Sequence, residues 1–462
     1  MRRPNICILA SSGWEVRNLL MSRAMNNIPP QQDVDVICPY AEYDQFRQRF
    51  PNFRTLAKMP EWGINDLDLI FLYALETSFW KTSSSLTHQY RQVMRRAMLR
   101  KEANPLKLVI KKAIQGTGGP SLIALSKKML HHRLRFSRPY RFYKDFFRRQ
   151  KTEIVVAGHS FNRNIYPALF AAKDLGLRAI GNIQSWDNVT GKAPLIIDFD
   201  RLLVWSQIME EELSRYYQIR ESQVQKIGPL QFDFYFDPAW IDSRQDFCAR
   251  FGFDPERKIV VYATVTSRLL PDEPLLVERF LQAYKEGRIT GDPNIMIRIH
   301  PRRNFEEFRG LSEDPRWQGL KVAWSVAGTP VKGSFSDDSW CPLDNEIRLL
   351  TNTVVHGDVN LNVFSTITLD YATQGKPAVL ICHNAADQRL PYYDGFDHFR
   401  PVLECQGHRV GFTLEETLGH LNAYLEDPDL DAAGRQRLVE LECGPFLGHA
   451  WERLAAILFN QH

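Results

Sequence analysis

The sequence predicts an α/β protein of two doubly wound, Rossmann-like domains that face a central cleft. Three observations predict it. The chain has 462 residues, more than one hydrophobic core usually supports. Short apolar runs alternate with helical patterns, which is typical of βαβ units with a parallel sheet. The same alternation restarts in the second half, so we expect one such domain in each half.

In the first half, the apolar runs predict a series of strands, and helical patterns lie between them. The predicted strands are Asn5–Ala10, Val34–Cys38, Leu67–Tyr73, Glu153–Ala157, Ala179–Ile183, Arg201–Trp205 and Gln223–Ile227. We expect helices over about Glu15–Asn26 and Asn164–Leu175, the second of which ends at Gly176.

The second half repeats this alternation. The predicted strands are Lys258–Ala263, Asn294–Ile299, Lys321–Trp324, Thr353–His356, Val363–Phe364 and Ala378–Cys382. A helix is expected over Pro274–Glu286 and a last one over about His449–Phe459. We place the domain boundary within Gln231–Asp254. The expected domains are 1–235 and 236–445, and 446–462 is a helix that crosses back to the first domain.

Composition limits the class of protein. Hydrophobic residues make up 44% and charged residues 24% of the chain, which is ordinary for folded domains. No apolar run approaches the length of a membrane-spanning helix, so we expect a cytoplasmic protein. The seven cysteines show no CxxC spacing and are expected to be reduced core residues.

The segment 81–151 is strongly basic. It contains 19 Lys and Arg against two acidic residues, a net charge of +17, and aromatic and aliphatic residues are interleaved with the cations. Such a composition is typical of basic amphipathic helices, so we expect a helical insertion that binds an anionic membrane surface, with a polyanionic acceptor as an open alternative. A solvated face with no partner stays an alternative. Nucleic acid is disfavoured because no nucleic-acid-binding motif is present.

Two segments of the second half place polar residues directly after strands. The run Val363-Phe364-Ser365-Thr366 leads into a predicted helix, where hydroxyls and free N–H groups suit a pyrophosphate, although an ordinary N-cap would look the same. About 65 residues earlier, Arg298-Ile299-His300-Pro301 ends a strand. A guanidinium offers the bidentate geometry that phosphate oxygens favour.

In this order the two segments resemble the donor half of GT-B transferases in the neighbourhood of CDP-glycerol glycerophosphotransferases, polysialyltransferases and capsule glycosyltransferases. The resemblance implies donor-binding roles for Arg298, His300, Arg302, Ser365, Thr366 and Asp370. Asp370 would contact the donor or orient the loop.

Segments of the first half are similar to a group of bacterial envelope-polysaccharide glycosyltransferases. The similarity rests on Ser185-Trp186-Asp187-Asn188, on Val204-Trp205, on Gly228 with Phe232-Asp233, and on Trp14 to Asn18. It implies that the first domain meets the acceptor. The implied acceptor-side residues are Trp14, Arg17, Asn18, Trp186 and Asn188.

Inverting glycosyl transfer needs a base for the acceptor hydroxyl. Asp187 and His159 both follow predicted strands, and we favour Asp187 because a carboxylate is ionised at neutral pH without tuning. A turn or cap role for Asp187 is equally compatible with the sequence. Asp337 and Asp338 lie in a polar loop, so we expect no metal and no cofactor.

The resemblance therefore implies an inverting transferase that moves a sugar from a nucleotide sugar to a lipid-linked or polysaccharide acceptor, at the inner face of the cytoplasmic membrane. Three alternatives stay open: a CDP-polyol phosphotransferase, an enzyme like UDP-N-acetylglucosamine 2-epimerase, and a non-catalytic scaffold. The sequence shows no match to the His-Gly-Glu and paired acidic residues of the epimerases.

Overall fold

The computed structural model describes residues 3–99, 102–326, 329–330, 340–341, 344–391 and 395–460. The chain divides into two compact units. Unit 1 comprises the chain up to Gln231, Gly395–His398 and the chain from His449 onward. Unit 2 comprises Phe232–Asp394 and Phe399–Gly448. The short segment Gly395–His398 of unit 1 was not expected from the sequence.

Unit 1 contains a seven-stranded sheet in which every pair of neighbouring strands is parallel. Its strands are β1 Ile6–Leu9, β2 Val34–Cys38, β3 Thr55–Lys58, β4 Ile154–Ala157, β5 Arg178–Asn182, β6 Arg201–Val204 and β7 Val224–Lys226. The order β3-β2-β1-β4-β5-β6-β7 reverses direction between β1 and β4. This reversal is the switch point at which open α/β sheets bind ligands.

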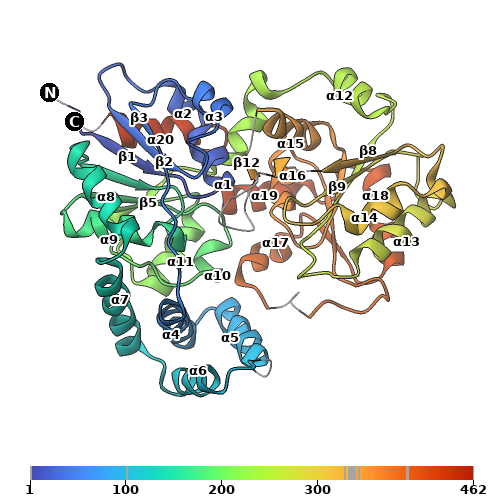
Figure 1. Cartoon of the computed structure of the whole chain (residues 1–462). Helices are drawn as coiled ribbons and strands as arrows, with labels where there is room; N and C mark the ends of the chain where they lie inside the picture. Colours follow the sequence, from blue (N-terminus) through green and yellow to red (C-terminus); the bar gives the residue numbers. More distant parts are fainter. Residues whose placement is uncertain are drawn as a thin grey trace. The chain divides into compact units, whose positions relative to one another are not determined.

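The helical elements of unit 1 cover this sheet, apart from four helices treated below (Figure 1). They are α1 Gly13–Glu15, the π-helix η1 Val16–Leu20, α2 Arg23–Asn26, α3 Asp44–Arg49, α8 Arg138–Arg149, η2 Arg163–Ile165, α9 Tyr166–Asp174, α10 Asn188–Gly191, α11 Gln207–Tyr217, η3 Glu221–Gln223 and α20 Ala450–Phe459. The single helix predicted over Glu15–Asn26 is therefore broken into three pieces. The last helix, α20, packs on α2, where the guanidinium of Arg23 lies 4.7 Å from the ring centroid of Trp451.

Four helices of unit 1 form a separate helical lobe, which consists of α4 Asp66–Thr82, α5 Leu86–Leu99, α6 Pro105–Thr117 and α7 Pro120–Leu134. In Figure 1, α5, α6 and α7 surround α4, and each of them packs on it. The prediction of a strand over Leu67–Tyr73 is wrong, because these residues lie in α4. Asn65 caps that helix, and Asp68 completes a capping box.

Only part of the basic segment 81–151 belongs to the lobe. Helix α8 buries Tyr143, Phe146 and Phe147 and packs on α9, directly before β4. The hydroxyl of Tyr140 donates a hydrogen bond to Asp174 at 2.5 Å. Tyr143, Phe146 and Phe147 of α8 are therefore core residues of unit 1, whereas Arg138, Arg141, Arg148 and Arg149 of the same helix are exposed.

Unit 2 contains a six-stranded sheet, again with parallel neighbours. Its strands are β8 Ile259–Ala263, β9 Asn294–Ile299, β10 Val322–Val326, β13 Val359–Asn362, β14 Ala378–Ile381 and β15 Arg409–Gly411. The order β10-β9-β8-β13-β14-β15 reverses between β8 and β13. A two-stranded antiparallel sheet joins β11 Thr329–Pro330 to β12 Trp340–Cys341.

Two predicted strands of this unit are wrong. Thr353–His356 is the end of helix α15, and Val363–Phe364 is the loop that follows β13. The strands β13 and β15 were not predicted, and neither was β3 of unit 1. The remaining helical elements of the chain are η4 Leu230–Phe236, η5 Pro238–Trp240, α12 Arg244–Phe251, α13 Glu273–Lys285, α14 Glu306–Ser312, η6 Pro315–Trp317, α15 Asp344–His356, α16 Ile367–Thr373, η7 Asp397–Phe399, α17 Arg400–Glu404, α18 Leu414–Glu426 and α19 Ala432–Cys443.

Both units thus have the doubly wound, Rossmann-like architecture that the sequence predicts. The central strands are completely buried, as in β1, β4, β8 and β13. Six cysteines are buried and free, and the side chain of Cys341 lies outside the described residues. Among the described residues, no helix combines the length and apolar character needed to cross a bilayer.

Candidate functional site

The switch point of unit 2 brings together the two predicted donor segments. Strands β9 and β13 lie on either side of β8, so their carboxyl ends are about two strand spacings, or roughly 10 Å, apart. Arg298 is in β9 and is buried, with 8% of its surface exposed. Its guanidinium lies 3.4 Å from the hydroxyl oxygen of Ser325 in the neighbouring strand.

The turn after β9 is held from both sides. The backbone N–H of His300 donates to the hydroxyl of Thr264, which follows β8, at 2.9 Å. Nδ1 of His300 accepts from the backbone N–H of Arg302 at 3.1 Å. The side chain of Arg302 is exposed, whereas its neighbour Arg303 is fully buried in an ion pair with Glu273. Arg303 therefore anchors the turn. Arg298 and His300 are better placed than Arg302 to meet a ligand at the carboxyl end of β9.

The loop Val363–Thr366 is fixed by Asn362, the last residue of β13. Its buried amide oxygen accepts from the backbone N–H of Ser365 at 2.8 Å, and its amide nitrogen donates to the hydroxyl of Thr368 at 3.0 Å and to Asn360 at 2.7 Å. Phe364 has a φ of +46°, which few residues other than glycine adopt. Such strain is often found at functional sites.

Ser365 and Thr366 are partly exposed at the start of α16. Asp370 lies one turn further along this helix, is buried, and accepts a hydrogen bond from the hydroxyl of Tyr235. Of its two expected roles, the contact with Tyr235 favours orientation of the helix and its loop over direct contact with a ligand.

The switch point of unit 1 is formed by the loop after β1 and the turn after β4. Glu15 lies there with no exposed surface, and its carboxylate accepts from the backbone N–H and hydroxyl of Ser11 and from the amide of Asn162. Burial raises the pKa of Glu15 to about 7, although these hydrogen bonds oppose the shift. A side chain at Gly158 would meet Leu9 O at 2.9 Å and Glu15, so glycine is needed here.

Three predicted acceptor-side residues follow Glu15 or precede it. The guanidinium of Arg17 lies 4.9 Å from the ring centroid of Trp14 and donates to the amide oxygen of Asn18 at 2.7 Å. Asn18 in turn donates to Gln231 at 2.9 Å. Arg17 and Asn18 are buried in the π-helix η1, a kind of distortion that is frequent at functional sites. The structure brings these residues together and bonds them to one another.

Asp187 follows β5 in a turn. It occupies the N-cap position of α10, but its carboxylate makes no capping hydrogen bond and instead accepts from the side-chain amide of Asn188 at 3.0 Å. Burial alone would raise the pKa of Asp187, but His398, Lys192 and Arg91 lower it below the ordinary value. The carboxylate is therefore ionised at neutral pH.

His159 belongs to the same group of side chains, which we call the Asp187 cluster: Arg91, His159, Asp187, Lys192 and His398. Burial lowers the pKa of His159 to about 3, and Lys192 adds to this effect. Neutral His159 thus has a buried ring nitrogen, Nδ1, without a hydrogen-bond partner among the described residues, and such atoms are uncommon in folded proteins.

His398 reaches the cluster from the segment Gly395–His398. Its ring meets Trp186 edge-on at a centroid distance of 5.1 Å, and its Nδ1 lies 3.4 Å from the hydroxyl of Thr190. The adjacent Asp397 accepts from the hydroxyl of Ser85 at 2.6 Å and from the N–H of Thr87 at 3.0 Å. Burial lowers the pKa of His398 to about 4, so its ring is neutral at pH 7.

The sequence did not reveal Glu15, Asn362 or His398 as site residues. Position after a strand at a switch point could have identified Glu15 and Asn362. No local signal could have identified His398, which lies more than 200 residues from Asp187. Asp337 and Asp338 fall outside the described residues. Among those described, no group of three or more His, Cys, Asp or Glu is arranged to hold a metal ion.

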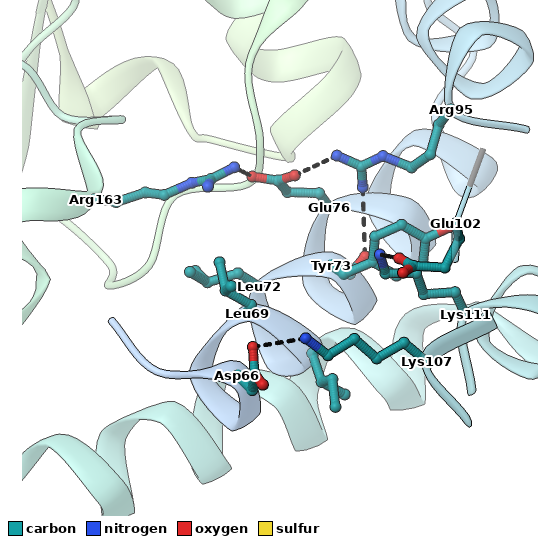
Figure 2. A pocket seen from close by; sticks show the side chains of 11 residues that line it. Asp66, Leu69, Leu72, Tyr73, Glu76, Arg95, Glu102, Lys107, Lys111 and Arg163 are labelled. Carbon is teal, nitrogen blue, oxygen red and sulfur yellow. Dashed lines mark hydrogen bonds and ion pairs between the residues drawn. The ribbon is translucent and has the colours of Figure 1, made fainter. Parts of the chain in front are cut away.

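A cavity lies in unit 1, between the helical lobe and Arg163. Figure 2 shows this cavity of about 260 Å³, with Glu76 between the guanidinium groups of Arg95 and Arg163. Lys107 pairs with Asp66 at 2.8 Å, and Lys111 pairs with Glu102. The pairs of Glu76 and Asp66 connect α4 to its neighbours, and no predicted donor-binding, acceptor-side or catalytic residue lines the cavity.

Comparison with known proteins gives a likeness of fold. No protein-family model and no curated protein sequence matches the chain. The structure is similar to a putative UDP-N-acetylglucosamine 2-epimerase from Listeria monocytogenes, with a TM-score of 0.58 and 10% identity, covering 99% of this chain and 96% of that chain. The S. aureus MnaA–UDP co-structure has a TM-score of 0.56 and 11% identity, covering 99% and 98%.

A glycosyltransferase from Rickettsia africae has a TM-score of 0.50 and 9% identity, and the match covers all of both chains. Identities this low establish the fold and nothing beyond it. The chain therefore has a GT-B-like fold, built from two Rossmann-like domains.

Proposed function

We propose that this chain is an inverting glycosyltransferase that uses a nucleotide-sugar donor and a lipid-linked or polysaccharide acceptor of the bacterial envelope. The observation that carries the proposal is the switch point of unit 2. There Arg298 and the loop around Ser365 flank β8, and Asn362 holds that loop in a strained conformation. The carboxyl ends of such strands are where doubly wound folds bind phosphate-containing ligands.

In this proposal, unit 2 holds the donor diphosphate. Arg298 supplies a permanent positive charge, and the hydroxyls of Ser365 and Thr366 donate hydrogen bonds to phosphate oxygens. His300 and Arg302 contact the outer phosphate or sugar. The charge that develops on the leaving diphosphate is then stabilised by side chains, without a metal ion or a cofactor.

The Asp187 cluster of unit 1 serves the acceptor. The acceptor oxygen attacks the anomeric carbon, its proton passes to Asp187, and the bond from that carbon to the diphosphate oxygen breaks with both electrons leaving on the diphosphate. Asp187 is suited to this role because it is ionised at neutral pH. Neutral His159 is the second candidate. Trp14, Trp186 and Asn188 would line the acceptor side, and the reaction would take place in the cytoplasm.

The test begins with thermal shift measurements on UDP, GDP, CDP, CMP and their common sugars. A ligand at 100 times its dissociation constant stabilises a protein by about 2.7 kcal/mol. We expect one nucleotide family to raise the melting temperature and Arg298→Ala to abolish that rise. Arg309→Ala is the control, because Arg309 is an exposed surface residue paired with Glu306.

Unchanged nucleotide affinity in Arg298→Ala would refute the diphosphate site. Product analysis with the stabilising donor then separates the alternatives. Transfer to an acceptor supports the proposal, a C2-epimerised sugar supports an epimerase, and transfer of a polyol phosphate from a CDP donor supports the phosphotransferase. A shift with no turnover supports the scaffold.

A further inference from the structure

Exposed apolar side chains are concentrated on the helical lobe of unit 1. Among the described residues, 16 large hydrophobic side chains are exposed, and ten of them lie between Leu67 and Phe136. The ten are Leu67, Leu69, Leu86, Val93, Met94, Met98, Leu106, Val109, Leu125 and Phe136. Single exposed hydrophobic residues are normal, but a group on one part of a surface indicates an interaction site.

Helix α5 has polar side chains on its buried side and apolar side chains on its exposed side. Its buried side includes Thr87, His88 and Gln92, whereas Val93 is 60% exposed. Two of these side chains are bonded: Gln92 donates to Thr77 O at 2.6 Å, and His88 Nδ1 lies 2.7 Å from the hydroxyl of Ser83. The helix is thus held with these polar side chains and Leu99 inward, and Val93, Met94 and Met98 are exposed among the described residues.

Helix α6 shows the same feature more strongly. Among its residues only Ile114 is buried, while Leu106 is 68% and Val109 65% exposed. These two residues are three positions apart and therefore lie on the same face of the helix. Such exposure is unfavourable in water, so we expect this face to be covered in the working state of the protein.

The same helices carry cations. Arg96 on α5, Lys112 on α6 and Lys128 on α7 are exposed, and none of them forms an ion pair with another described residue. Over Asp66–Leu134 the chain has 12 Lys and Arg against four Asp and Glu, a net charge of +8, which makes the lobe complementary to an anionic surface. A second copy would be repelled by like charge, and nucleic acid would leave Leu106 and Val109 in water.

We propose that the helical lobe docks on an anionic lipid bilayer, with Val93, Met94, Leu106 and Val109 inserted among the headgroups and Arg96, Lys112 and Lys128 against lipid phosphates. The lobe would lie in the interface, as basic amphipathic helices do. Docking itself is argued from exposure and charge. Its role, to bring the enzyme to a lipid-linked acceptor, rests on the proposed function.

The test is co-flotation of the full chain with vesicles of phosphatidylcholine alone or mixed with phosphatidylglycerol. We expect binding to the anionic vesicles only. Leu106→Ser/Val109→Ser should weaken it about tenfold or more. Replacing Arg96, Lys112 and Lys128 by Gln should weaken it about fivefold for each cation. The control is Leu275→Ser/Leu441→Ser, which changes exposed leucines of unit 2.

Three outcomes would overturn the proposal: a wild-type chain that stays free of anionic vesicles, a control variant that loses as much binding as Leu106→Ser/Val109→Ser, or a lobe that binds duplex nucleic acid and no vesicle. The nucleotide thermal shift is measured on the same variants. Leu106 and Val109 lie in unit 1, far along the chain from Arg298. A nucleotide thermal shift that is unchanged in Leu106→Ser/Val109→Ser therefore shows that membrane docking can be lost while donor binding is kept.

Discussion

Asn362 offers the sharpest test of how unit 2 builds its loop. Its side chain has no exposed surface and bonds to Asn360, Ser365 and Thr368. Asn362→Ala removes these three partners. At a net 0.5–1.5 kcal/mol for each hydrogen bond, the free energy of unfolding should fall by about 3 kcal/mol. For a unit of this size, that lowers the melting temperature by about 6–12 °C.

Asn362→Asp tests the loop through its charge. The carboxylate still accepts from the N–H of Ser365 but no longer donates to Asn360 or Thr368, and it adds a negative charge beside the proposed diphosphate site. Because the buried carboxylate also faces the amide oxygen of Asn360, this variant should lose stability as well, and we expect its nucleotide affinity to fall further than that of Asn362→Ala. The control is Asn422→Ala, which removes hydrogen bonds at the exposed residues Arg288 and Thr290.

Calorimetric or fluorescence melting gives the stability, and titration with the stabilising nucleotide gives the affinity. A melting temperature of Asn362→Ala equal to that of Asn422→Ala would refute the assigned hydrogen bonds. Nucleotide affinity that survives in Asn362→Asp would instead place the diphosphate away from this loop.

Two further predictions concern unit 1. Burial raises the pKa of Glu15 from 4.5 to about 7, so the stability that Glu15 contributes is fully present below pH 4.5 and is lost as the pH rises through 7. In chemical unfolding, Glu15→Gln should reduce the loss of stability between about pH 5 and 8 by about 3 kcal/mol. Parallel pH profiles of stability for the two proteins would contradict this. Asp187→Asn should lower the transfer rate at least about 100-fold with donor affinity unchanged, whereas full activity in Asp187→Asn together with loss in His159→Ala would make His159 the base.

Most strands could be predicted because a fully buried parallel strand has a short continuous apolar run. Asn294–Ile299 was predicted with its observed bounds, and Ile154–Ala157 within one residue. The same signal misled at Leu67–Tyr73, the first turns of α4, where Leu72 is buried but Leu67 and Leu69 are exposed. Periodicity cannot separate these cases. The Asn65 cap and Asp68 were the signals that could have done so.

The sequence by itself determined the doubly wound class and the positions of the residues that follow strands, because parallel strands bring their carboxyl ends to one edge. This local rule was enough to select Arg298, Ser365, His159 and Asp187. Only the tertiary structure decided which of these side chains are fixed by hydrogen bonds to other residues and which are charged at neutral pH. Asn362 fixes the loop of Ser365, and His398 joins Asp187 from a segment more than 200 residues away. Such contacts depend on how distant segments pack, so they cannot be predicted from the spacing of side chains along the chain.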